Sequence, residues 1–192
     1  MSRRIVVAIS GASGAVYGIR ALEILREIPD TETHLIISSG AQTTIAMETD
    51  RTAREIAELA DVSHRESNLA ASISSGSFPT DGMLVAPCSI KTLSAIASSF
   101  ADNLIARAAD VTLKERRPLV LLFRETPLHL GQIRLMLQAT EAGATLMPPV
   151  PAFYHRPQSI AEIVDHTVGR ALDQLGFELD SVRRWNGRPP SL

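Results

Sequence analysis

The sequence predicts a three-layer α/β/α sandwich with a parallel β-sheet of at least five strands, formed by a single domain that spans residues 1–192. Three observations predict it. Short apolar runs, of the kind that form strands buried on both faces, alternate along the chain with segments of helical periodicity. The segments between strands are about 15 to 30 residues long, which suits right-handed helical crossovers. Several strands end in polar or glycine-containing turns, which would gather at one edge of the sheet.

The composition is ordinary for a soluble globular protein, with 45% hydrophobic and 21% charged residues. The formal net charge of -2 argues against a general nucleic-acid or membrane-surface binder. Cys88 is the only cysteine, which excludes an intramolecular disulfide and suits a reducing compartment. The first residues lack a signal-peptide pattern, and no apolar run approaches the roughly 20 residues of a membrane helix. We therefore expect a cytoplasmic protein without membrane insertion.

The first predicted strand, residues 5–9, is an apolar run that ends in a glycine-rich turn, residues 10–14. A helical pattern follows from residue 15 to about residue 28. Such a turn directs backbone N–H groups and the positive end of the helix dipole at one spot, which suits a phosphate or another electron-rich group. The same glycines also suit a tight strand-to-helix turn without a ligand, so the residues alone leave both interpretations open.

The second predicted strand, residues 34–37, leaves through residues 38–40 into a helix over residues 41–48. Serines at a helix start are more often caps than ligand contacts. Ser38 nevertheless repeats the first arrangement, with a hydroxyl group at the same edge of the sheet. Glu48 closes this helix, where a glutamate is usually a solvated surface residue.

The middle of the chain begins with a Thr-x-x-Glu capping box, which predicts a short helix over residues 52–59. Residues 61–82 are polar and show no clear periodicity, so this stretch is either functional or mobile. Residues 83–86 have the length and flanks of a buried strand. That run breaks at Pro87 into residues 88–92, after which a helical pattern resumes.

A second helix–strand pair follows. Asp102 is a suitable N-cap for a helix over residues 103–116, and Leu119–Phe123 is the next buried strand. This strand ends on Arg124 and Glu125. An arginine beside a carboxylate at the ligand end of a sheet can bind phosphate while the acid moves protons.

The predicted helix over residues 103–116 carries Arg107 and Lys114, which are seven residues apart and hence share one face. Asp110 lies between them and can pair with either. These cations suit an anionic ligand, but a solvated, salt-bridged helix face is the more ordinary interpretation.

The last third of the chain predicts a helix over residues 130–142, a strand over residues 144–147 and a proline-framed aromatic loop over residues 152–157. A second capping box at Ser159 starts a helix that runs to residue 175. An extended tail follows from about residue 180.

Three further side chains also suit ordinary structural roles. Tyr154 could present its hydroxyl group rigidly or simply pack, and Arg170 would ordinarily be a surface residue. Cys88 suggests a nucleophile, but a small buried residue after a strand is the better interpretation because no histidine motif accompanies it.

Eight short motifs occur in register between residues 5 and 185. They are residues 10–14 (SGASG), 48–50 (ETD), 74–78 (SSGSF), 87–92 (PCSIKT), 107–110 (RAAD), 113–116 (LKER), 124–127 (RETP) and 151–155 (PAFYH). Each is weak alone, but together they resemble those of the UbiX-type flavin prenyltransferases, a family earlier described as aromatic-acid decarboxylases.

The resemblance implies a flavodoxin-like or Rossmann-like fold and a dodecameric homo-oligomer whose sites are shared between subunits. It implies an enzyme that joins reduced FMN and dimethylallyl monophosphate into prenylated FMN. The product would be the cofactor of a UbiD-type decarboxylase, with ubiquinone biosynthesis as the suggested pathway.

The resemblance also implies roles for single residues. FMN would contact Gly11, Ala12, Ser13, Ser38, Ser89, Ile90, Lys91, Thr92 and Arg124. The donor phosphate would contact Lys114, Tyr154 and Arg170, with Arg107 and Arg124 nearby. Glu125 would be the acid–base at the leaving phosphate. Glu48 and Ser13 would assist proton removal as the flavin is alkylated at N5 and closed at C6.

No metal is expected, because the sequence has no acidic motif of the DDxxD kind. The positive charge must then come from arginine and lysine side chains converging beside the flavin, which favours a monophosphate donor over a diphosphate. Which donor the cell prefers stays open.

Two alternatives remain. An FMN-dependent decarboxylase of a small substrate would need a carboxylate site in place of the cationic residues. A non-catalytic FMN carrier would keep the FMN loops but would have no need of Glu125, Glu48 or Lys114.

Overall fold

A six-stranded, wholly parallel sheet forms the centre of the molecule in the computed structural model, which describes residues 2–179, 184, 185 and 187. The strand order is β3-β2-β1-β4-β5-β6. The strands are β1 (Arg3–Ile9), β2 (Thr31–Ile37), β3 (Val62–Arg65), β4 (Gly82–Cys88), β5 (Leu119–Phe123) and β6 (Thr145–Leu146). The order reverses between β1 and β4, as in the doubly wound Rossmann-like sheet. The predicted parallel sheet is confirmed.

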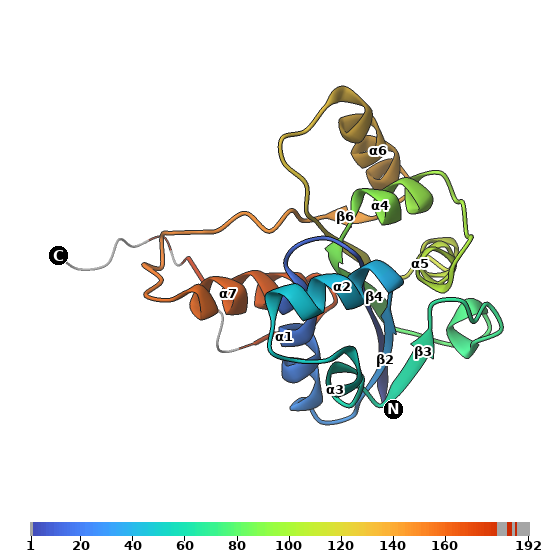
Figure 1. Ribbon diagram of the computed structural model, residues 1–192, viewed down its shortest axis with the longest axis horizontal. Coiled ribbons are helices and arrows are strands. Elements are labelled where there is room, and N and C mark those ends of the chain that lie inside the picture. Colours follow the sequence, from blue (N-terminus) through green and yellow to red (C-terminus); the bar gives the residue numbers. More distant parts are fainter. Residues whose placement is uncertain (1, 180–183, 186, 188–192) are drawn as a thin grey trace.

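Helices cover both faces of the sheet, which confirms the three layers (Figure 1). They are α1 (Ala15–Arg26), α2 (Ser39–Glu48), α3 (Ala53–Ala57), α4 (Ile90–Ala97), α5 (Leu104–Lys114), α6 (Leu130–Glu141) and α7 (Ile160–Asp173). One core cluster joins α1, α2, α3 and α7 to one face of the sheet, and a second joins α4, α5 and α6 to the other. Among the described residues, no helix is long and apolar enough to cross a membrane.

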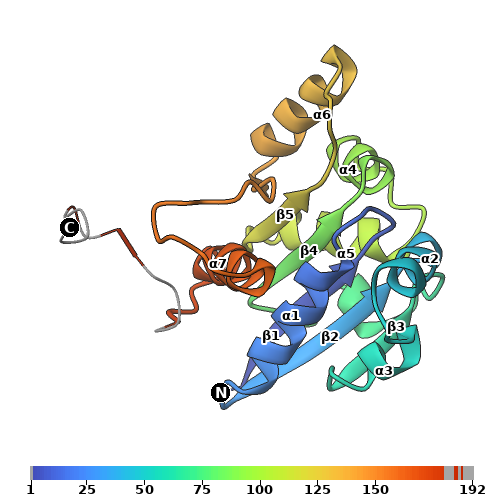
Figure 2. The same ribbon diagram turned by 60° about the vertical axis from the view of Figure 1, so that its left-hand side comes forward.

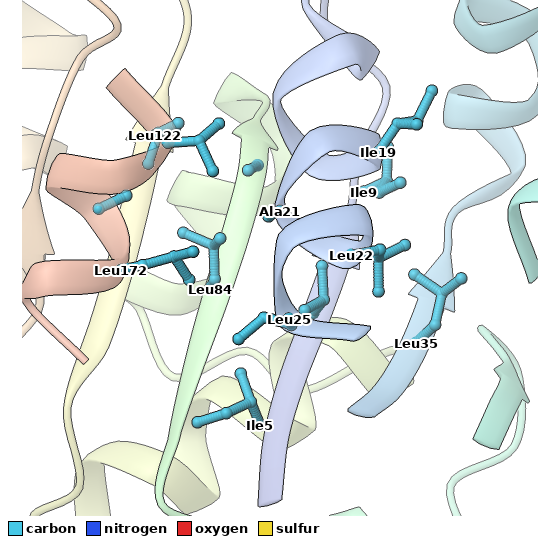
Figure 3. Packing of buried hydrophobic residues seen from close by; sticks show 14 of the residues in the cluster. Ile5, Ile9, Ile19, Ala21, Leu22, Leu25, Leu35, Leu84, Leu122 and Leu172 are labelled. Carbon is cyan, nitrogen blue, oxygen red and sulfur yellow. The ribbon is translucent and has the colours of Figure 1, made fainter. Parts of the chain in front are cut away.

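Alternation along each strand divides its side chains between the two cores. Ile5 and Ile9 of β1 face α1 and α7, whereas Val6 and Ala8 belong to the opposite core. Figure 3 shows leucines of α1 and Leu172 of α7 packed over the first of these faces. Residues 5–9 of β1 are buried on both faces, and this part of the strand is therefore continuously apolar.

β2 begins three residues before the predicted strand, at Thr31, and two other strands differ further from the sequence prediction. The polar stretch after residue 61 contains β3, a four-residue edge strand whose side chains are only partly buried, so it carries no apolar run. It also contains a short 3₁₀ turn, Ser72–Ser74. β4 continues through Pro87 to Cys88 with a register shift against β5, where the predicted strand stopped at residue 86. A proline cannot donate to the ladder, and an irregularity accommodates it.

The predicted helix boundaries were accurate within a few residues, but two caps were wrong. Asn103, not Asp102, caps α5, because its Oδ1 accepts from the Ala106 N–H at 3.0 Å. Ser159 caps α7, but the Glu162 carboxylate accepts from Gln158 N–H rather than completing a box. The predicted tail from about residue 180 lies largely outside the described residues.

A chain of polar side chains ties edge strand β3 to the sheet. Arg4 donates to Glu32 at 2.8 Å, and His34 Nε2 donates to the other oxygen of Glu32 at 3.0 Å. His34 Nδ1 lies 2.9 Å from His64 Nε2 on β3. The hydrogen bond from Arg4, and then that from His34, lowers the pKa of Glu32.

We expect Glu32→Gln to destabilise the protein by about 1–2 kcal/mol at pH 7, because an ionised hydrogen-bond acceptor is lost. The pKa of Glu32 is lower in the folded protein, so its contribution exists above the unfolded value of about 4.3 and is lost as the pH falls through the folded value. Urea unfolding at pH 7 and below pH 4 measures the difference in unfolding free energy between the wild type and Glu32→Gln. This difference should become smaller in acid. Glu58→Gln, in an exposed pair, is the matched control. A difference in unfolding free energy that does not change with pH would contradict a stabilising role for the ionised Glu32 carboxylate.

Candidate active site

A pocket of about 160 Å³ lies where the strand order reverses, at the carboxyl ends of β1, β2 and β4. In doubly wound sheets this crevice is the usual ligand site. Its lining residues are Gly11, Ser38, Ser39, Gly40, Glu66, Ser89, Ile90, Lys91, Thr92 and Asn103. Six of the nine predicted FMN contacts are therefore together, and Ala12, Ser13 and Arg124 lie outside the lining.

Four lining residues were not predicted: Ser39, Gly40, Glu66 and Asn103. Ser39 and Gly40 directly follow Ser38, so the strand-exit argument extends to them. Asn103 is as good an N-cap as Asp102, which is the signal that could have placed it. Glu66 follows β3, and without recognising that strand no sequence signal brings it here.

Hydrogen bonds of Ser10 join the ends of β1 and β4 beneath the pocket. Its hydroxyl group donates to the Pro87 carbonyl at 2.9 Å and accepts from the Ser89 N–H at 2.8 Å. Ser10 is buried, so these bonds are shielded from water. The two turns that carry most of the pocket are thus held in one geometry.

The turn after β1 touches the first turn of α2 through backbone alone. A Cβ atom added to Gly11 would lie 3.0 Å from two backbone atoms of Gly40. Only glycine allows this approach, and it leaves main-chain groups as the surface of the pocket. Backbone cradles of this kind suit the phosphate-bearing part of a nucleotide.

Two of the helix N-termini at this edge are already occupied by carboxylates. Glu48 accepts from the N–H groups of Gly14 and Ala15 at 2.9 and 3.1 Å, which caps α1. Glu66 accepts from the Ser39 N–H at 2.8 Å, at the start of α2. The interpretation of Glu48 as an ordinary surface residue was therefore incomplete, since it is exposed but has a structural partner. The Gly14 N–H is therefore not available to a phosphate, and this part of the first glycine-rich turn does not support phosphate binding.

The N-terminus of α4 is better suited to an anion. Ser89 caps this helix by accepting from the Thr92 N–H at 3.3 Å, and its hydroxyl group donates to Thr92 Oγ1 at 3.1 Å. Lys91 in the first turn adds a positive charge beside the pocket. The helix dipole and the Lys91 ammonium group both favour a negatively charged ligand at this N-terminus.

Arg124 and Glu125 lie one strand further along the same edge. Backbone pairing of Arg124 N–H with the Cys88 carbonyl at 3.0 Å places them beside the exit of β4. Arg124 is exposed and Glu125 is half-buried, with its carboxylate accepting from the Thr126 N–H at 3.1 Å. Cys88 is fully buried, and burial raises the pKa of its thiol far above the usual range, which supports a packing role.

Arg107 and Lys114 do not reach this pocket within one chain. Arg107 donates to the Ser74 carbonyl at 3.0 Å and pairs with Asp110 at 3.1 Å, and Lys114 pairs with Glu115. Asn103 at the start of α5 lines the pocket, whereas Lys114 is at the other end of this helix, about 16 Å away along its axis.

Tyr154, in the loop before α7, and Arg170, on α7, belong to a second cluster. The Tyr154 hydroxyl group lies 2.9 Å from His166 Nε2, and Arg170 is one turn beyond His166. Arg170 pairs at 2.7 Å with Asp173, whose carboxylate also holds Arg184 at 2.8 and 2.9 Å. α5 and α7 cover opposite faces of the sheet (Figure 2), so the two predicted groups of cations do not converge within one chain.

Comparisons with known proteins give one consistent result. The family model described as "Flavoprotein" matches residues 1–171. The flavin prenyltransferase UbiX of Escherichia coli K12 is 59% identical over 187 residues, covering 96% of this chain and 99% of that protein. The flavin prenyltransferase UbiX of Thauera aromatica is 57% identical over 184 residues, covering 96% of this chain and 94% of that protein.

Two solved structures have nearly the same fold. AnUbiX (PadA1), solved in complex with FMN and dimethylallyl pyrophosphate, superposes with a TM-score of 0.95 at 52% identity over 98% of this chain and all of that chain. A dodecameric FMN-dependent UbiX-like decarboxylase from Escherichia coli O157:H7 superposes with a TM-score of 0.93 at 50% identity, covering 96% of this chain and all of that one.

Proposed function

The chain belongs to the flavoprotein family and, within it, to the flavin prenyltransferases, and from this premise we propose that it joins dimethylallyl monophosphate to reduced FMN to make prenylated FMN. One observation carries the proposal. The pocket at the reversal of strand order gathers Gly11, Ser38, Ser89 and three neighbours, which the family resemblance assigns to FMN.

The pocket suits FMN in its chemistry. The first turn of α4 offers Ser89, Thr92 and Lys91 to a phosphate, and the close Gly11–Gly40 contact leaves main-chain groups beside them. Ala12, Ser13 and Arg124 extend the proposed contacts along the same edge. When bound, the reduced flavin supplies two electron-rich ring atoms, N5 and C6, to which the prenyl group is joined.

Cationic side chains would stabilise the phosphate as it leaves the prenyl group. Breaking the allylic C–O bond leaves the electron pair, and hence negative charge, on the departing phosphate. Lys114, Arg107, Arg124 and Arg170 supply fixed positive charge that needs little reorganisation as this charge develops. Glu125 gives a proton to the leaving phosphate oxygen, while N5 loses its proton as the first bond forms. Closure at C6 adds one proton to the prenyl double bond and removes the proton from C6, which Glu48 with Ser13 assists.

The site is assembled from several subunits in this proposal. α5 carries Lys114 and α7 carries Arg170 on opposite faces of the sheet, so the two can meet only between chains. An exposed apolar stripe on α6, formed by Leu130, Ile133 and Leu137, offers a surface for such assembly. We propose a homododecamer, as in the Escherichia coli O157:H7 relative. Its product would pass to a UbiD-type decarboxylase in the cytoplasm, with ubiquinone biosynthesis as the pathway.

The proposal is tested by mixing the purified protein anaerobically with reduced FMN and dimethylallyl monophosphate and recording the mass of the flavin product. A flavin heavier by one C5 unit supports it. Unchanged, tightly bound FMN would favour a carrier, and CO₂ release from an added small acid would favour a decarboxylase. Parallel reactions with the diphosphate donor decide which donor is used.

Subunit mixing tests the shared site. We expect Lys114→Met and Arg170→Met each to abolish most activity, and co-expressed mixed oligomers to recover about a quarter of it, because random pairing restores both side chains at one site in four. Tandem affinity tags isolate the mixed oligomer for assay. Lys114→Met mixed with Arg107→Met is the matched control, since every α5 helix then lacks one cation. Activity recovered in the Lys114→Met and Arg107→Met mixture would contradict a site shared between subunits. So would the absence of recovered activity in the Lys114→Met and Arg170→Met mixture.

A further inference from the structure

His166 is held beside a proposed phosphate ligand, although the family resemblance assigns it no role. Its Nε2 lies 2.9 Å from the Tyr154 hydroxyl oxygen, and the two rings meet edge-on at 80° with centroids 5.6 Å apart. On the other side, His155 stacks on His166 at 4.4 Å and 14°. The imidazole therefore has a set orientation, with Nε2 aimed at Tyr154.

The direction of this hydrogen bond decides what Tyr154 can offer a phosphate. A hydroxyl group has one proton to donate. If His166 Nε2 carries no proton, it accepts the tyrosine proton, and the oxygen lone pairs that remain would repel phosphate oxygens. If Nε2 carries a proton, it donates to the tyrosine oxygen and leaves the tyrosine proton for the ligand.

An anion beside Tyr154 favours the second arrangement, because only this arrangement presents the tyrosine proton to the anion. Burial, then His155 and Arg170, lowers the pKa of His166, while Asp173 opposes these effects. The ring is therefore neutral near pH 7, and the choice lies between its two neutral tautomers. Arg170, on α7, and Arg184 both pair with Asp173, so an anion placed beside Tyr154 would meet positive charge.

We propose that His166 is a positioning residue of the donor-phosphate site: its Nε2–H donates to the Tyr154 hydroxyl oxygen and so directs the tyrosine proton at the phosphate of the dimethylallyl donor. This inference rests on the proposed function, because Tyr154 is a phosphate ligand there. His166 itself touches neither the donor nor the flavin.

A double-mutant cycle tests the coupling. We expect His166→Phe and Tyr154→Phe each to raise the KM for dimethylallyl monophosphate about tenfold with little change in kcat, because a phosphate contact of this kind acts on binding. The double variant should also be weakened about tenfold, not a hundredfold, since both changes remove the same contact. His166→Gln should stay within about twofold of the wild type, because its amide N–H can replace Nε2–H.

A purely structural role for His166 gives a different result. It would lower the melting temperature, affect KM and kcat alike, and add to the effect of Tyr154→Phe. Additive effects in the cycle, or a His166→Gln variant as impaired as His166→Phe, would overturn the proposal.

Binding of inorganic phosphate to the full-length protein, measured by calorimetry across the same four variants, separates this inference from the proposed function. Non-additive binding in a protein that makes no prenylated flavin would leave the inference standing while the function fails. An active wild type with additive effects would overturn the inference alone.

Discussion

Replacing Glu125 by glutamine is expected to lower kcat for prenyl transfer by about 100- to 10,000-fold, the range for loss of a general acid. The amide has nearly the same size and can still accept from the Thr126 N–H, so the exit of β5 keeps its shape. What is lost is the proton for the departing phosphate oxygen. FMN affinity should stay near that of the wild type, because Glu125 does not line the pocket.

Single-turnover formation of prenylated FMN, together with FMN binding followed by fluorescence, measures the two effects separately. Glu27→Gln, an exposed glutamate at the far end of α1, is the matched control and should be as active as the wild type. A Glu125→Gln variant with more than a tenth of wild-type kcat would remove Glu125 from its proposed role.

Gly18→Ala is expected to destabilise the fold by about 3 kcal/mol or to prevent soluble expression. A Cβ atom at this position would lie 2.2 Å from the Ala86 carbonyl oxygen and 2.7 Å from Ile9 Cγ1. Both neighbours belong to central strands and are fully buried, so neither can move aside cheaply. Helix α1 would have to lift away from the two strands that carry the pocket.

Urea unfolding of the two purified proteins measures the loss, with solubility as the readout if Gly18→Ala does not fold. Gly131→Ala on exposed α6 is the control, since its Cβ atom would meet only the His129 side chain and alanine favours a helix. It should change stability by less than about 1 kcal/mol. A Gly18→Ala variant as stable as the control would show that the close packing of α1 on the sheet is not required.

Sequence patterns identified the central strands because burial on both faces demands a continuous apolar run, as in β1 and β5. The same rule failed for β3. This strand lies at the edge of the sheet, pairs with β2, and has polar, partly exposed residues. Besides the backbone ladder, Glu32, His34 and His64 join it to β2, and no local pattern marks side chains that meet across strands.

The candidate pocket was predictable in part for a related reason. Parallel strands deliver their carboxyl ends to one edge, so Gly11, Ser38 and Ser89 were expected near one another and are. The roles of Lys114, Tyr154, Arg170 and Glu48 came from the family resemblance; spacing had only placed Lys114 on one helix face with Arg107. Glu66 was missed because it reaches the pocket through a strand that the pattern did not reveal.

By itself, the sequence determined the alternation of strands and helices, the parallel sheet and the edge at which polar turns gather, because periodicity and turn chemistry act over a few residues. Only the tertiary structure decided that Glu48 and Glu66 occupy two helix N-termini, that α5 and α7 carry their cations on opposite faces, and that His166 is held against Tyr154. Those contacts join residues far apart in the chain. Their geometry depends on how whole elements pack, which no short stretch of sequence encodes.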